Sequence, residues 1–427
     1  RARDMLPCFL RAARLGPPLA SSSIGLGRHC HRSLATVAIG ISGGVDSSVA
    51  AMMLKEQGHD VIGVHMTNWD VAEEGQELCG EQDARDARKV CDHLGIGFHR
   101  VSFVREYWND VFEPLLQGYQ AGGTPNPDVA CNRHIKFDRF VTHALDLGAD
   151  RVATGHYARV YHSALDSDGA SRLLIAADPV KDQTYFLAAV RQSALRVCDF
   201  PIGHLHKPDV RTHAAHAGLH TATKRDSMGI CFIGKRKFAD FLNDYLPQEP
   251  GRFVCFDSGR DLGEHRGYAV YTPGQRARVG GHEARCYVVD KDPDTNVVRI
   301  CEGADHPALF ARQLITSPSA TSWIRGMPPA DLDGGRILRC LARVRHPGPL
   351  HACTVERDLV QPGSLRVSFD EPVRWLAEMQ AIAFYLDGEC LGGSTILERG
   401  PTLWEEACGL NRLGFSGDGD VATFVSG

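Results

Sequence analysis

The first half of the chain alternates short apolar runs with longer amphipathic stretches. Leu34–Ile41 and Asp60–Met66 are apolar runs of strand length, and Phe98–Phe103 and Asp150–Thr154 repeat the pattern further along. Short apolar runs bounded by glycine or polar residues predict buried strands. Because helical stretches separate them, the pattern predicts an α/β fold built on a doubly wound parallel sheet.

The stretches between these runs have helical spacing. In Gln82–Leu94 the apolar residues fall on one side of a helix. Tyr107–Tyr119 is a second predicted helix, and it carries large apolar side chains such as Trp108 and Phe112. We expect both helices to pack against the predicted sheet.

From about residue 238 the pattern changes to short strands separated by turns. Arg252–Val254, Tyr268–Gln275 and Arg285–Asp290 are predicted strands of a small central mixed domain. From about residue 311, strands such as Leu338–Val344 and Leu365–Phe369 alternate around Pro-Gly turns and predict a C-terminal β-barrel-like domain. The predicted boundaries are a leader at 1–34, the α/β domain at 35–225, the central domain at 226–309, the barrel-like domain at 310–398 and a frayed tail at 399–427.

Length and composition fit a protein of two or three domains. The 427 residues carry a formal net charge of −5, so any contact with RNA must come from local patches. The 14 cysteines include no C-x-x-C pair, which argues against zinc ribbons and against a disulfide-stapled secreted scaffold and favours a reducing compartment. No run of about 18 apolar residues is present, so we expect no membrane span.

The start of the chain differs from the rest. Over roughly the first 35 residues, six arginines stand against a single acid, Asp4, with Ser21, Ser22 and Ser23 among small residues. An arginine-rich, acid-poor leader without a long apolar core is typical of a mitochondrial transit peptide. A disordered tail is the alternative interpretation.

The most informative stretch is Gly40–Ser48, with the sequence GISGGVDSS. It follows an apolar run and precedes Val49–Leu54, so it predicts a strand, a glycine-rich turn and the first turn of a helix. This geometry points backbone N–H groups and the positive end of a helix dipole at one spot, which suits pyrophosphate. The stretch is neither a Walker A loop nor a G-x-G-x-x-G fingerprint. A tight turn without a ligand is the alternative.

A second informative stretch contains Asp128 and Cys131. Prolines at 125 and 127 argue against a regular helix through residue 127, so we expect both side chains on a stiff loop that enters a helix at Asn132. A cysteine just before a helix start gains thiolate character from the helix dipole. A buried structural thiol is the alternative for Cys131.

Three further stretches carry candidate contacts. Cys231 is flanked by glycines at 229 and 234, which predicts a mobile segment that could carry a sulfur atom. Gly155 and His156 end a predicted strand where a nucleotide could approach closely, although His156 alone also fits a structural role. The polar turn at residues 181–183 precedes an apolar helix, with Asp182 as the expected N-cap. Its other two residues are solvated or contact phosphate and base.

The Gly40–Ser48 loop, the Asn126–Asn132 stretch and the Asp226–Gly234 stretch together resemble the tRNA-specific 2-thiouridylases of the N-type ATP pyrophosphatase superfamily. With the leader, the chain looks like their mitochondrial members, and the resemblance covers residues 35–396. It implies an adenine nucleotide α-hydrolase-like fold and ATP-dependent 2-thiolation of the wobble uridine in mitochondrial tRNAs of the Lys, Glu and Gln type. The C2 oxygen would be adenylated, and sulfur would come from a cysteine persulfide.

The resemblance also implies a role for each matching residue. Cys131 would be the nucleophile, Cys231 the persulfide carrier and Asp128 a general acid or base. Met66 would contact adenine, and Gly155 would close against the nucleotide. The residues implied to hold the ATP phosphates are Gly40, Ile41, Ser42, Gly43, Gly44, Val45, Asp46 and Ser47. The residues implied to contact the target base or the tRNA are Asn126, Pro127, Asp128, His156, Lys181, Asp182, Gln183, Arg345, His346 and Gln380.

Cofactors and partners follow from the same resemblance. ATP and Mg²⁺ are the implied cofactors, with no resident metal. The implied partners are the anticodon loop and stem of tRNA and a cysteine desulfurase or sulfur-relay protein, and we expect a monomer in the mitochondrial matrix. Met228, Lys235 and Pro273 depart from the family's pattern without touching the two catalytic cysteines. A cysteine-ligated iron-sulfur cluster has no visible set of ligands in the sequence.

Two other functions share parts of this pattern. An adenylating ligase of the argininosuccinate, NAD or GMP synthetase kind would use the same loop on a small substrate, and it would need neither cysteine. A tRNA-binding protein with a relic nucleotide fold would bind ATP without releasing AMP.

Overall fold

The structure, a computed structural model, describes residues 34–69, 79–162, 169–226, 236–280 and 284–410. Two parts of the sequence prediction lie outside these residues. They are the leader, of which only Leu34 is described, and the segment that carries Cys231; the predicted tail is described only as far as residue 410.

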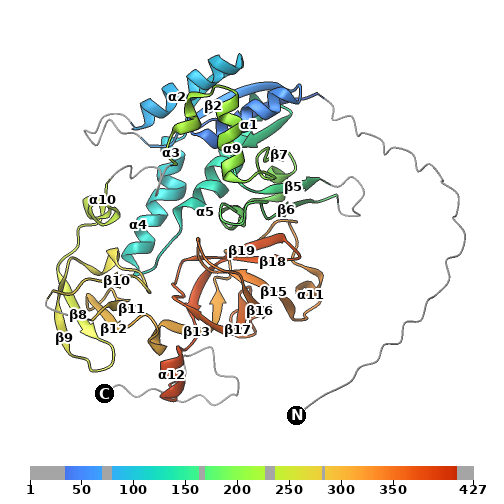
Figure 1. Cartoon of the computed structure of the whole chain (residues 1–427). Helices are drawn as coiled ribbons and strands as arrows, with labels where there is room; N and C mark the ends of the chain where they lie inside the picture. The colour runs from blue at the N-terminus through green and yellow to red at the C-terminus, as the bar shows by residue number, and fades with distance from the viewer. Residues whose placement is uncertain (1–33, 70–78, 163–168, 227–235, 281–283, 411–427) are drawn as a thin grey trace, which may run out of the picture. The chain divides into compact units, whose positions relative to one another are not determined.

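Five strands form a parallel sheet in the order β3-β2-β1-β4-β7 (Figure 1). Ile39 in the central strand pairs with Gly63 on one side and with Ala153 on the other. The strand order therefore reverses at β1, and this confirms the predicted doubly wound parallel sheet. The strands are β1 (Thr36–Gly40), β2 (Asp60–Thr67), β3 (Gly97–Ser102), β4 (Arg151–Thr154) and β7 (Cys198–Asp199).

Side chains of β1 alternate between two hydrophobic clusters, one on each face of the sheet. Val37 and Ile39 belong to one cluster and Ala38 to the other, and all three are fully buried. A strand buried on both faces appears in the sequence as a continuous apolar run. Helices on the first face are α1 (Val45–Glu56), α2 (Cys79–Leu94) and α9 (Lys207–His216), and those on the second include α4 (Glu113–Gln120) and α6 (Phe140–Asp146).

The helix predicted over Tyr107–Tyr119 forms as three consecutive segments. A π-helical turn, η2, joins α3 to α4 and carries Trp108 and Phe112. Both rings pack on Trp69, which follows β2, with ring centroids 5.8 and 4.7 Å away. Tyr245 of α10 adds to this aromatic cluster, with its ring 4.9 Å from that of Phe112. The bounds are α3 (Val104–Tyr107), η2 (Trp108–Phe112) and α10 (Phe238–Tyr245).

The rest of the first domain consists of short elements. They are α5 (Pro127–Cys131), η3 (Asn132–Arg139), β5 (Arg159–His162), β6 (Ser171–Leu174), α7 (Thr184–Leu187), α8 (Gln192–Leu195) and η4 (His220–Thr223).

The predicted central mixed domain is a five-stranded sheet in the order β10-β11-β12-β8-β9. Its β12–β8 pair is parallel, whereas the other pairs are antiparallel. The strand predicted at Tyr268–Gln275 is wrong, because Tyr268–Val270 forms a 3₁₀ turn, η5, and a Pro-Gly turn follows. The strands are β8 (Gly251–Cys255), β9 (Asp261–His265), β10 (Arg276–Ala277), β11 (Cys286–Asp292) and β12 (Val297–Glu302).

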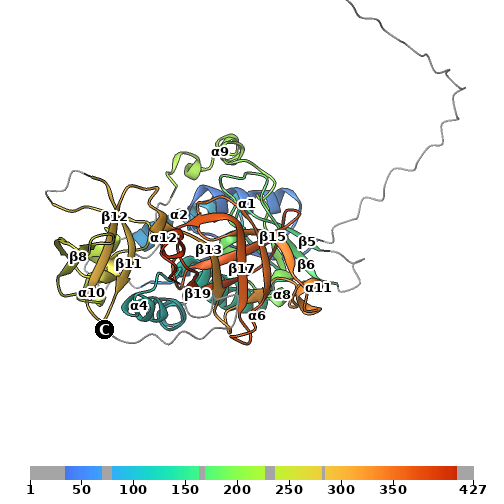
Figure 2. The ribbon, with the colours of Figure 1, turned by 90° about the horizontal axis from the view of Figure 1, so that it is seen from below.

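The last domain is a closed antiparallel barrel, which agrees with the predicted β-barrel-like fold. Its six strands follow the order β13-β17-β16-β15-β18-β19, and pairing of β13 with β19 closes the ring. Figure 2 shows β13, β15, β17 and β19 grouped around the barrel. The strands are β13 (Phe310–Thr316), β15 (Leu338–Arg343), β16 (His351–Arg357), β17 (Leu365–Arg374), β18 (Ala381–Leu386) and β19 (Glu389–Arg399). Smaller elements here are η6 (Pro307–Leu309), β14 (Ser322–Trp323) and α11 (Ala330–Asp333).

Two strands of the first domain extend the barrel sheet. β5 pairs with β6, and β6 pairs with β19 through Cys390 and Leu173. Ile175 also donates its backbone N–H to the carbonyl oxygen of Gly388 at 2.9 Å. The α/β domain and the barrel are therefore joined by main-chain hydrogen bonds.

The frayed tail predicted from residue 399 is wrong for its first part. Helix α12 (Leu403–Ala407) forms there, and Thr402 and Glu405 make a complete capping box. Reciprocal capping satisfies the free N–H groups of a short helix, and this explains its formation. Arg399 adds an ion pair to Glu405 at 2.8 Å.

In the part of the chain that the structure describes, no helix has both the length and the apolar character needed to cross a membrane. The domain boundaries given from the sequence remain predictions.

Candidate active site

The Gly40–Ser48 loop joins β1 to α1 at the edge where the strand order reverses. Ligands bind at this point in open α/β sheets. The Ser42 N–H donates to Ser47 Oγ at 3.2 Å, and the two serine hydroxyl oxygens are also 3.2 Å apart. Ser48 Oγ donates to the Gly44 carbonyl at 2.8 Å. The loop thus folds over the start of α1 and leaves a helix N-terminus suited to a phosphate group.

Gly43 is the residue of this loop that requires glycine. Its φ is +73°, and a Cβ atom there would lie 2.5 Å from the Asp83 carbonyl oxygen of α2. A side chain would therefore push the loop away from α2.

Asp46 links the first turn of α1 to two side chains that are distant in the sequence, and a third such side chain contacts the loop at Gly43. Its carboxylate accepts from the Tyr157 hydroxyl at 2.8 Å and from Lys207 Nζ at 2.8 and 2.7 Å. Lys224 Nζ donates to the Gly43 carbonyl at 3.0 Å. Burial, together with Asp46, raises the pKa of Tyr157, so this hydroxyl stays protonated as a donor. The sequence interpretation missed these three partners of the loop.

Met66 and Gly155, the two other predicted nucleotide contacts, both lie beside the phosphate loop. The Met66 side chain lies beside Gly40, where an added Cβ would be 3.3 Å from its terminal methyl carbon. A Cβ on Gly155 would lie 2.6 Å from the backbone nitrogen of Ser47. The backbone that approaches Gly155 is thus the loop's own, and contact of Gly155 with a nucleotide stays a prediction.

Gly155→Ala is expected to weaken ATP binding by about 10- to 100-fold, because overpacking of a rigid site typically costs about 1–3 kcal/mol. The new methyl group would meet the loop backbone at Asp46 and Ser47, which cannot move without opening the phosphate site. Gly97→Ala, in β3 of the same sheet, is the matched control because nothing lies within 4 Å of its Cβ position. Isothermal calorimetry with ATP makes the comparison. Equal affinities for the two variants would contradict the assignment of the loop.

The helix that carries Asp128 and Cys131 begins earlier than predicted. Asn126 is its N-cap, and its Oδ1 accepts from the N–H groups of Asp128 at 3.1 Å and Val129 at 3.2 Å. Pro127 is the first helical residue, a position where the missing N–H costs nothing. The predicted stiff loop up to Asn132 is therefore wrong.

Cys131 ends α5, and helical structure continues directly into η3. The predicted thiolate effect of a helix start therefore does not apply, because the dipole acts within the first turn. Cys131 is only 4% exposed and shares a hydrophobic cluster with Ile135 and Phe137. The cysteine is buried within the first domain, and its role as nucleophile or as structural thiol stays a prediction.

Asp128 is the acidic residue closest in sequence to this cysteine. Burial raises its pKa, and Lys136 and His346 counteract part of that effect. A buried carboxyl group with a raised pKa is a candidate for proton transfer. Asp128 lies three residues before Cys131, so both lie on the same side of the helix.

A cavity of about 220 Å³ lies beside the same helix and is separate from Asp128 and Cys131. Val129, Ala130 and Arg133 line it, and these positions lie on the opposite side of the helix. Strands β18 and β19 supply the facing wall.

Gln380 connects the barrel to the start of α5. Its Oε1 accepts from Asn126 Nδ2 at 2.9 Å and from the Tyr185 hydroxyl at 3.1 Å. The structure thus gives Gln380 a role in orienting the N-cap Asn126. Its predicted contact with tRNA is not tested.

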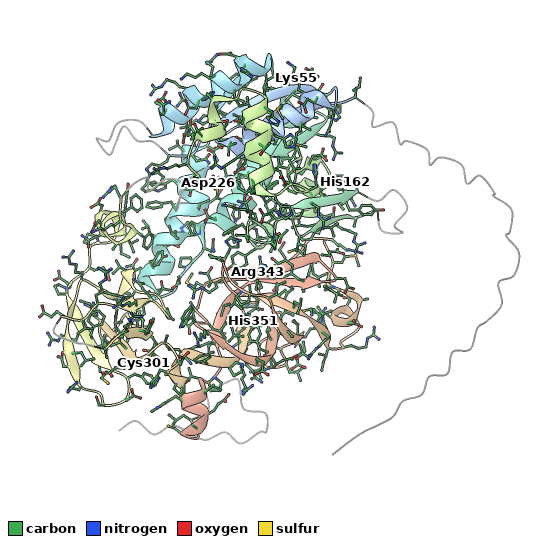
Figure 3. The ribbon with its side chains drawn as sticks, in the orientation of Figure 1. Lys55, His162, Asp226, Cys301, Arg343 and His351 are labelled. Atoms are coloured by element: carbon green, nitrogen blue, oxygen red, sulfur yellow. The ribbon has the colours of Figure 1, made fainter. Side chains whose placement is uncertain are left out.

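Asp182 is not the N-cap that the sequence suggested, because Gln183 holds that position. The Asp182 side chain is buried and accepts from the Ala176 N–H at 3.0 Å and the Thr184 hydroxyl at 2.8 Å. Arg343 of the barrel, labelled in Figure 3, pairs with it at 2.9 Å. Asp182 therefore serves as a link between domains.

Three other residues predicted to contact tRNA differ in burial: His156 is buried, whereas Lys181 and Gln183 are half-buried. His156 is buried against Phe137, its Nδ1 lies 2.7 Å from Thr154 Oγ1, and burial lowers its pKa well below the usual value. Gln183 accepts from the Tyr157 N–H at 2.8 Å. Lys181 pairs with Asp226 at 3.0 Å.

Arg345 and His346 lie on the connection after β15. The Arg345 guanidinium lies 4.9 Å from the Trp375 ring centroid, and His346 Nε2 lies 3.0 Å from the Asp182 carbonyl oxygen. Burial lowers the pKa of both side chains. Their predicted tRNA contacts also stay predictions.

Cys231, the predicted persulfide carrier, lies outside the described residues. The described chain before it ends at Asp226, labelled in Figure 3. Asp226 pairs with Lys207 at 3.0 Å and with Arg211 at 2.7 Å, in addition to Lys181. The last described residue before that segment is therefore linked, through Lys207 and Asp46, to the phosphate loop.

Comparison with known families gives three consecutive matches along the chain. Residues 35–235 match the family described as the tRNA methyl transferase HUP domain, and residues 239–302 match the tRNA methyl transferase PRC-barrel domain. Residues 315–396 match the aminomethyltransferase beta-barrel domain.

Three curated relatives cover most of the chain. A protein of Alkaliphilus oremlandii named tRNA-specific 2-thiouridylase MnmA is 46% identical over 365 residues, which are 84% of this chain and 96% of that protein. The mitochondrial tRNA-specific 2-thiouridylase 1 of Gallus gallus is 42% identical over 405 residues, with 88% and 95% covered. That of Homo sapiens is 43% identical over 406 residues, with 90% and 96% covered.

The parallel sheet with its phosphate loop, followed by a small sheet and a closed barrel, defines a nucleotide-binding HUP-domain protein of the ATP pyrophosphatase type. Its similarity to the three relatives extends through all three folded domains. The chain belongs to the tRNA-specific 2-thiouridylase family.

Proposed function

We propose that this chain is a tRNA-uridine 2-sulfurtransferase, which replaces the C2 oxygen of a uridine in tRNA by sulfur and converts ATP to AMP and pyrophosphate. One observation carries this proposal. The helical run bearing Asp128 and Cys131 packs against the strand that leads into the phosphate loop. Its residue Phe140 would lie 3.4 Å from a Cβ on Gly40. The proposed nucleotide site and the Cys131 thiol would thus be positioned by the same packed elements.

Activation of the uracil is the first step. The C2 oxygen is a poor leaving group, so it attacks the α-phosphorus of ATP, an O–P bond forms, and the bond to the β-phosphate oxygen breaks. Backbone N–H groups of residues 40–47 would bind the charge that develops on the departing pyrophosphate. The product is a uridine adenylated at O2.

Sulfur transfer is the second step, and it uses two cysteines. The Cys131 thiolate attacks the inner sulfur of a persulfide on Cys231, which forms a Cys131–Cys231 disulfide and releases hydrosulfide. Hydrosulfide then attacks C2, and AMP leaves with the former C2 oxygen. A thiol reductant must supply two electrons to restore the cysteines.

Asp128 is the proposed proton-transfer group beside the uracil. Burial raises the pKa of Asp128, which favours the proton-donating form that would act at the carbonyl oxygen or at N3 of the uracil. Asn126 and Pro127 at the helix start would contact the base.

ATP is the nucleotide, and magnesium would enter with its phosphates. Among the described residues, no group of three or more His, Cys, Asp or Glu side chains could hold a metal ion by itself. Asp46 lies at the loop and offers a hard oxygen ligand, so the residues fit a cation carried mainly by the phosphates. Magnesium supplies charge neutralisation there.

The target base and the partners are the finer part of the proposal. The wobble uridine of tRNAs for Lys, Glu and Gln lies in a single-stranded loop, where extruding a base costs little. We place the chain in mitochondria, in line with the two vertebrate relatives, and more specifically in the matrix. It would act as a monomer supplied by a cysteine desulfurase or a sulfur-relay protein.

A substrate-dependence assay tests the proposal. With ATP, a tRNA transcript and a persulfide donor, we expect one AMP for each 2-thiouridine, and AMP formation that requires tRNA. Mass spectrometry of nucleosides and chromatography of nucleotides measure the two products. ATP–pyrophosphate exchange in the absence of tRNA would instead favour an adenylating ligase. ATP binding without AMP release would favour a tRNA-binding protein.

A further inference from the structure

Lys207 is a buried lysine that lies between two carboxylates. Its ammonium is within 2.8 Å of both oxygens of Asp46 and 3.0 Å from Asp226, and the residue is only 9% exposed. Asp46 is the second residue of α1, directly before Ser47 of the phosphate loop. The ammonium therefore contacts the residue that directly precedes Ser47 of the proposed phosphate site.

The local fold does not explain a cation at this position. Lys207 is the first residue of α9, where the helix dipole disfavours positive charge. Burial of an ammonium also costs free energy unless carboxylates compensate. Asp46 and Asp226 supply that compensation, so these two carboxylates, and not the helix, hold the ammonium beside the phosphate loop.

Asp226 is shared by three cations. Lys181, Lys207 and Arg211 all lie within 3.0 Å of its carboxylate oxygens. Burial alone would raise the pKa of Asp226, but the hydrogen bonds from Lys207 and Lys181 outweigh it and hold the pKa at about 2. Asp226 can consequently give up one cation and keep two.

Asp46 can likewise release the ammonium. The Tyr157 hydroxyl still donates to its carboxylate at 2.8 Å, and the carboxylate lies at the favourable N-terminal end of α1. Neither carboxylate would be left unpartnered if Lys207 turned toward a new anion.

We propose that Lys207 is a pyrophosphate ligand of the ATP site, held by Asp46 and Asp226 until the phosphates arrive. When ATP binds, the ammonium turns from the two carboxylates to the β- and γ-phosphate oxygens and stabilises the charge that appears as pyrophosphate leaves. Asp226 is a positioning residue that competes with the phosphates for the same ammonium. This inference rests on the proposed ATP-dependent function and names a residue that the sequence interpretation did not assign.

Calorimetric binding of Mg-ATP, magnesium pyrophosphate and AMP to the full chain without tRNA tests the inference. Lys207→Met is expected to weaken ATP and pyrophosphate by about 10-fold or more, as for loss of a hydrogen bond to a charged group. AMP lacks the two phosphates, so its affinity should be unchanged. Lys207→Arg keeps the charge and should restore most of the pyrophosphate binding.

Lys55→Met, at the opposite end of α1, is the matched control and should bind all three ligands normally. Equal weakening of AMP and pyrophosphate by Lys207→Met, or no weakening at all, would overturn the proposal. If Lys207→Met does not fold, Asp226→Asn provides the test. Removing the carboxylate that competes for the Lys207 ammonium should tighten pyrophosphate binding. Unchanged or weaker pyrophosphate binding would reject the proposal. These assays measure ligand binding and involve no thiolation. A failure of the proposed function would appear instead in the assay of AMP and 2-thiouridine formation.

Discussion

Cys131→Ser is expected to lower 2-thiouridine formation by at least about 10³-fold, a loss typical for removal of a nucleophile. The hydroxyl cannot attack the persulfide sulfur as a thiolate does, so no hydrosulfide is released in the site. ATP binding should persist, because Cys131 lies in α5 and outside the phosphate loop. Mass spectrometry of tRNA nucleosides measures the loss.

The control for this variant is Cys408→Ser, because Cys408 is exposed and far along the chain from the site. Thermal unfolding of both variants separates lost chemistry from lost structure, since the serine hydroxyl would be buried at position 131. Added sulfide supplies the species that Cys131 would release, so it should restore part of the activity. Normal thiolation by Cys131→Ser would remove this residue from the mechanism.

Arg343→Met is expected to lower the free energy of unfolding by about 3–5 kcal/mol, the usual cost of leaving one member of a buried ion pair alone. The side chains of Arg343 and Asp182 are only 11% and 3% exposed, and their atoms lie 2.9 Å apart. Without the guanidinium, the Asp182 carboxylate would keep only the donors from Ala176 and Thr184. Urea unfolding followed by fluorescence measures the change.

Arg339→Met supplies the comparison within the same strand. Arg339 pairs with Asp370, but its side chain is 64% exposed, so its loss should cost at most about 1 kcal/mol. Replacing Asp182 by asparagine in the Arg343→Met background should recover part of the stability, because the buried charge is removed. Equal losses for the two single variants would show that burial of the Arg343 pair is energetically unimportant.

The α/β sheet could be predicted because its signals are local. Each strand is an apolar run, and Gly40–Ser48 contains its turn, its glycines and its hydroxyl groups within nine residues. The internal hydrogen bonds of that loop also involve near neighbours, such as Ser42 with Ser47. The sequence motif of this loop therefore contains nearly all the residues that determine the loop's own conformation.

The start of α5 was mispredicted because one physical rule was applied without its exception. Proline disrupts helix interiors, but Pro127 occupies the first helical position, where Asn126 caps the helix. The same error placed Cys131 at a helix start and led to the wrong inference about its thiolate. An Asn-Pro-Asp sequence could have signalled an N-cap followed by a helix.

Lys207, Tyr157 and Arg343 could not be found from local patterns. Lys207 and Tyr157 meet Asp46 across 161 and 111 positions of the chain, and Arg343 meets Asp182 across 161. Only the folded arrangement of distant elements shows that these side chains belong to the site or support it.

The pairing of β6 with β19 has a consequence for how the enzyme could work. Hydrogen bonds between these strands, with an ion pair between Arg172 and Glu389, tie the α/β domain directly to the barrel. Any rearrangement during the reaction must then bend some other part of the chain.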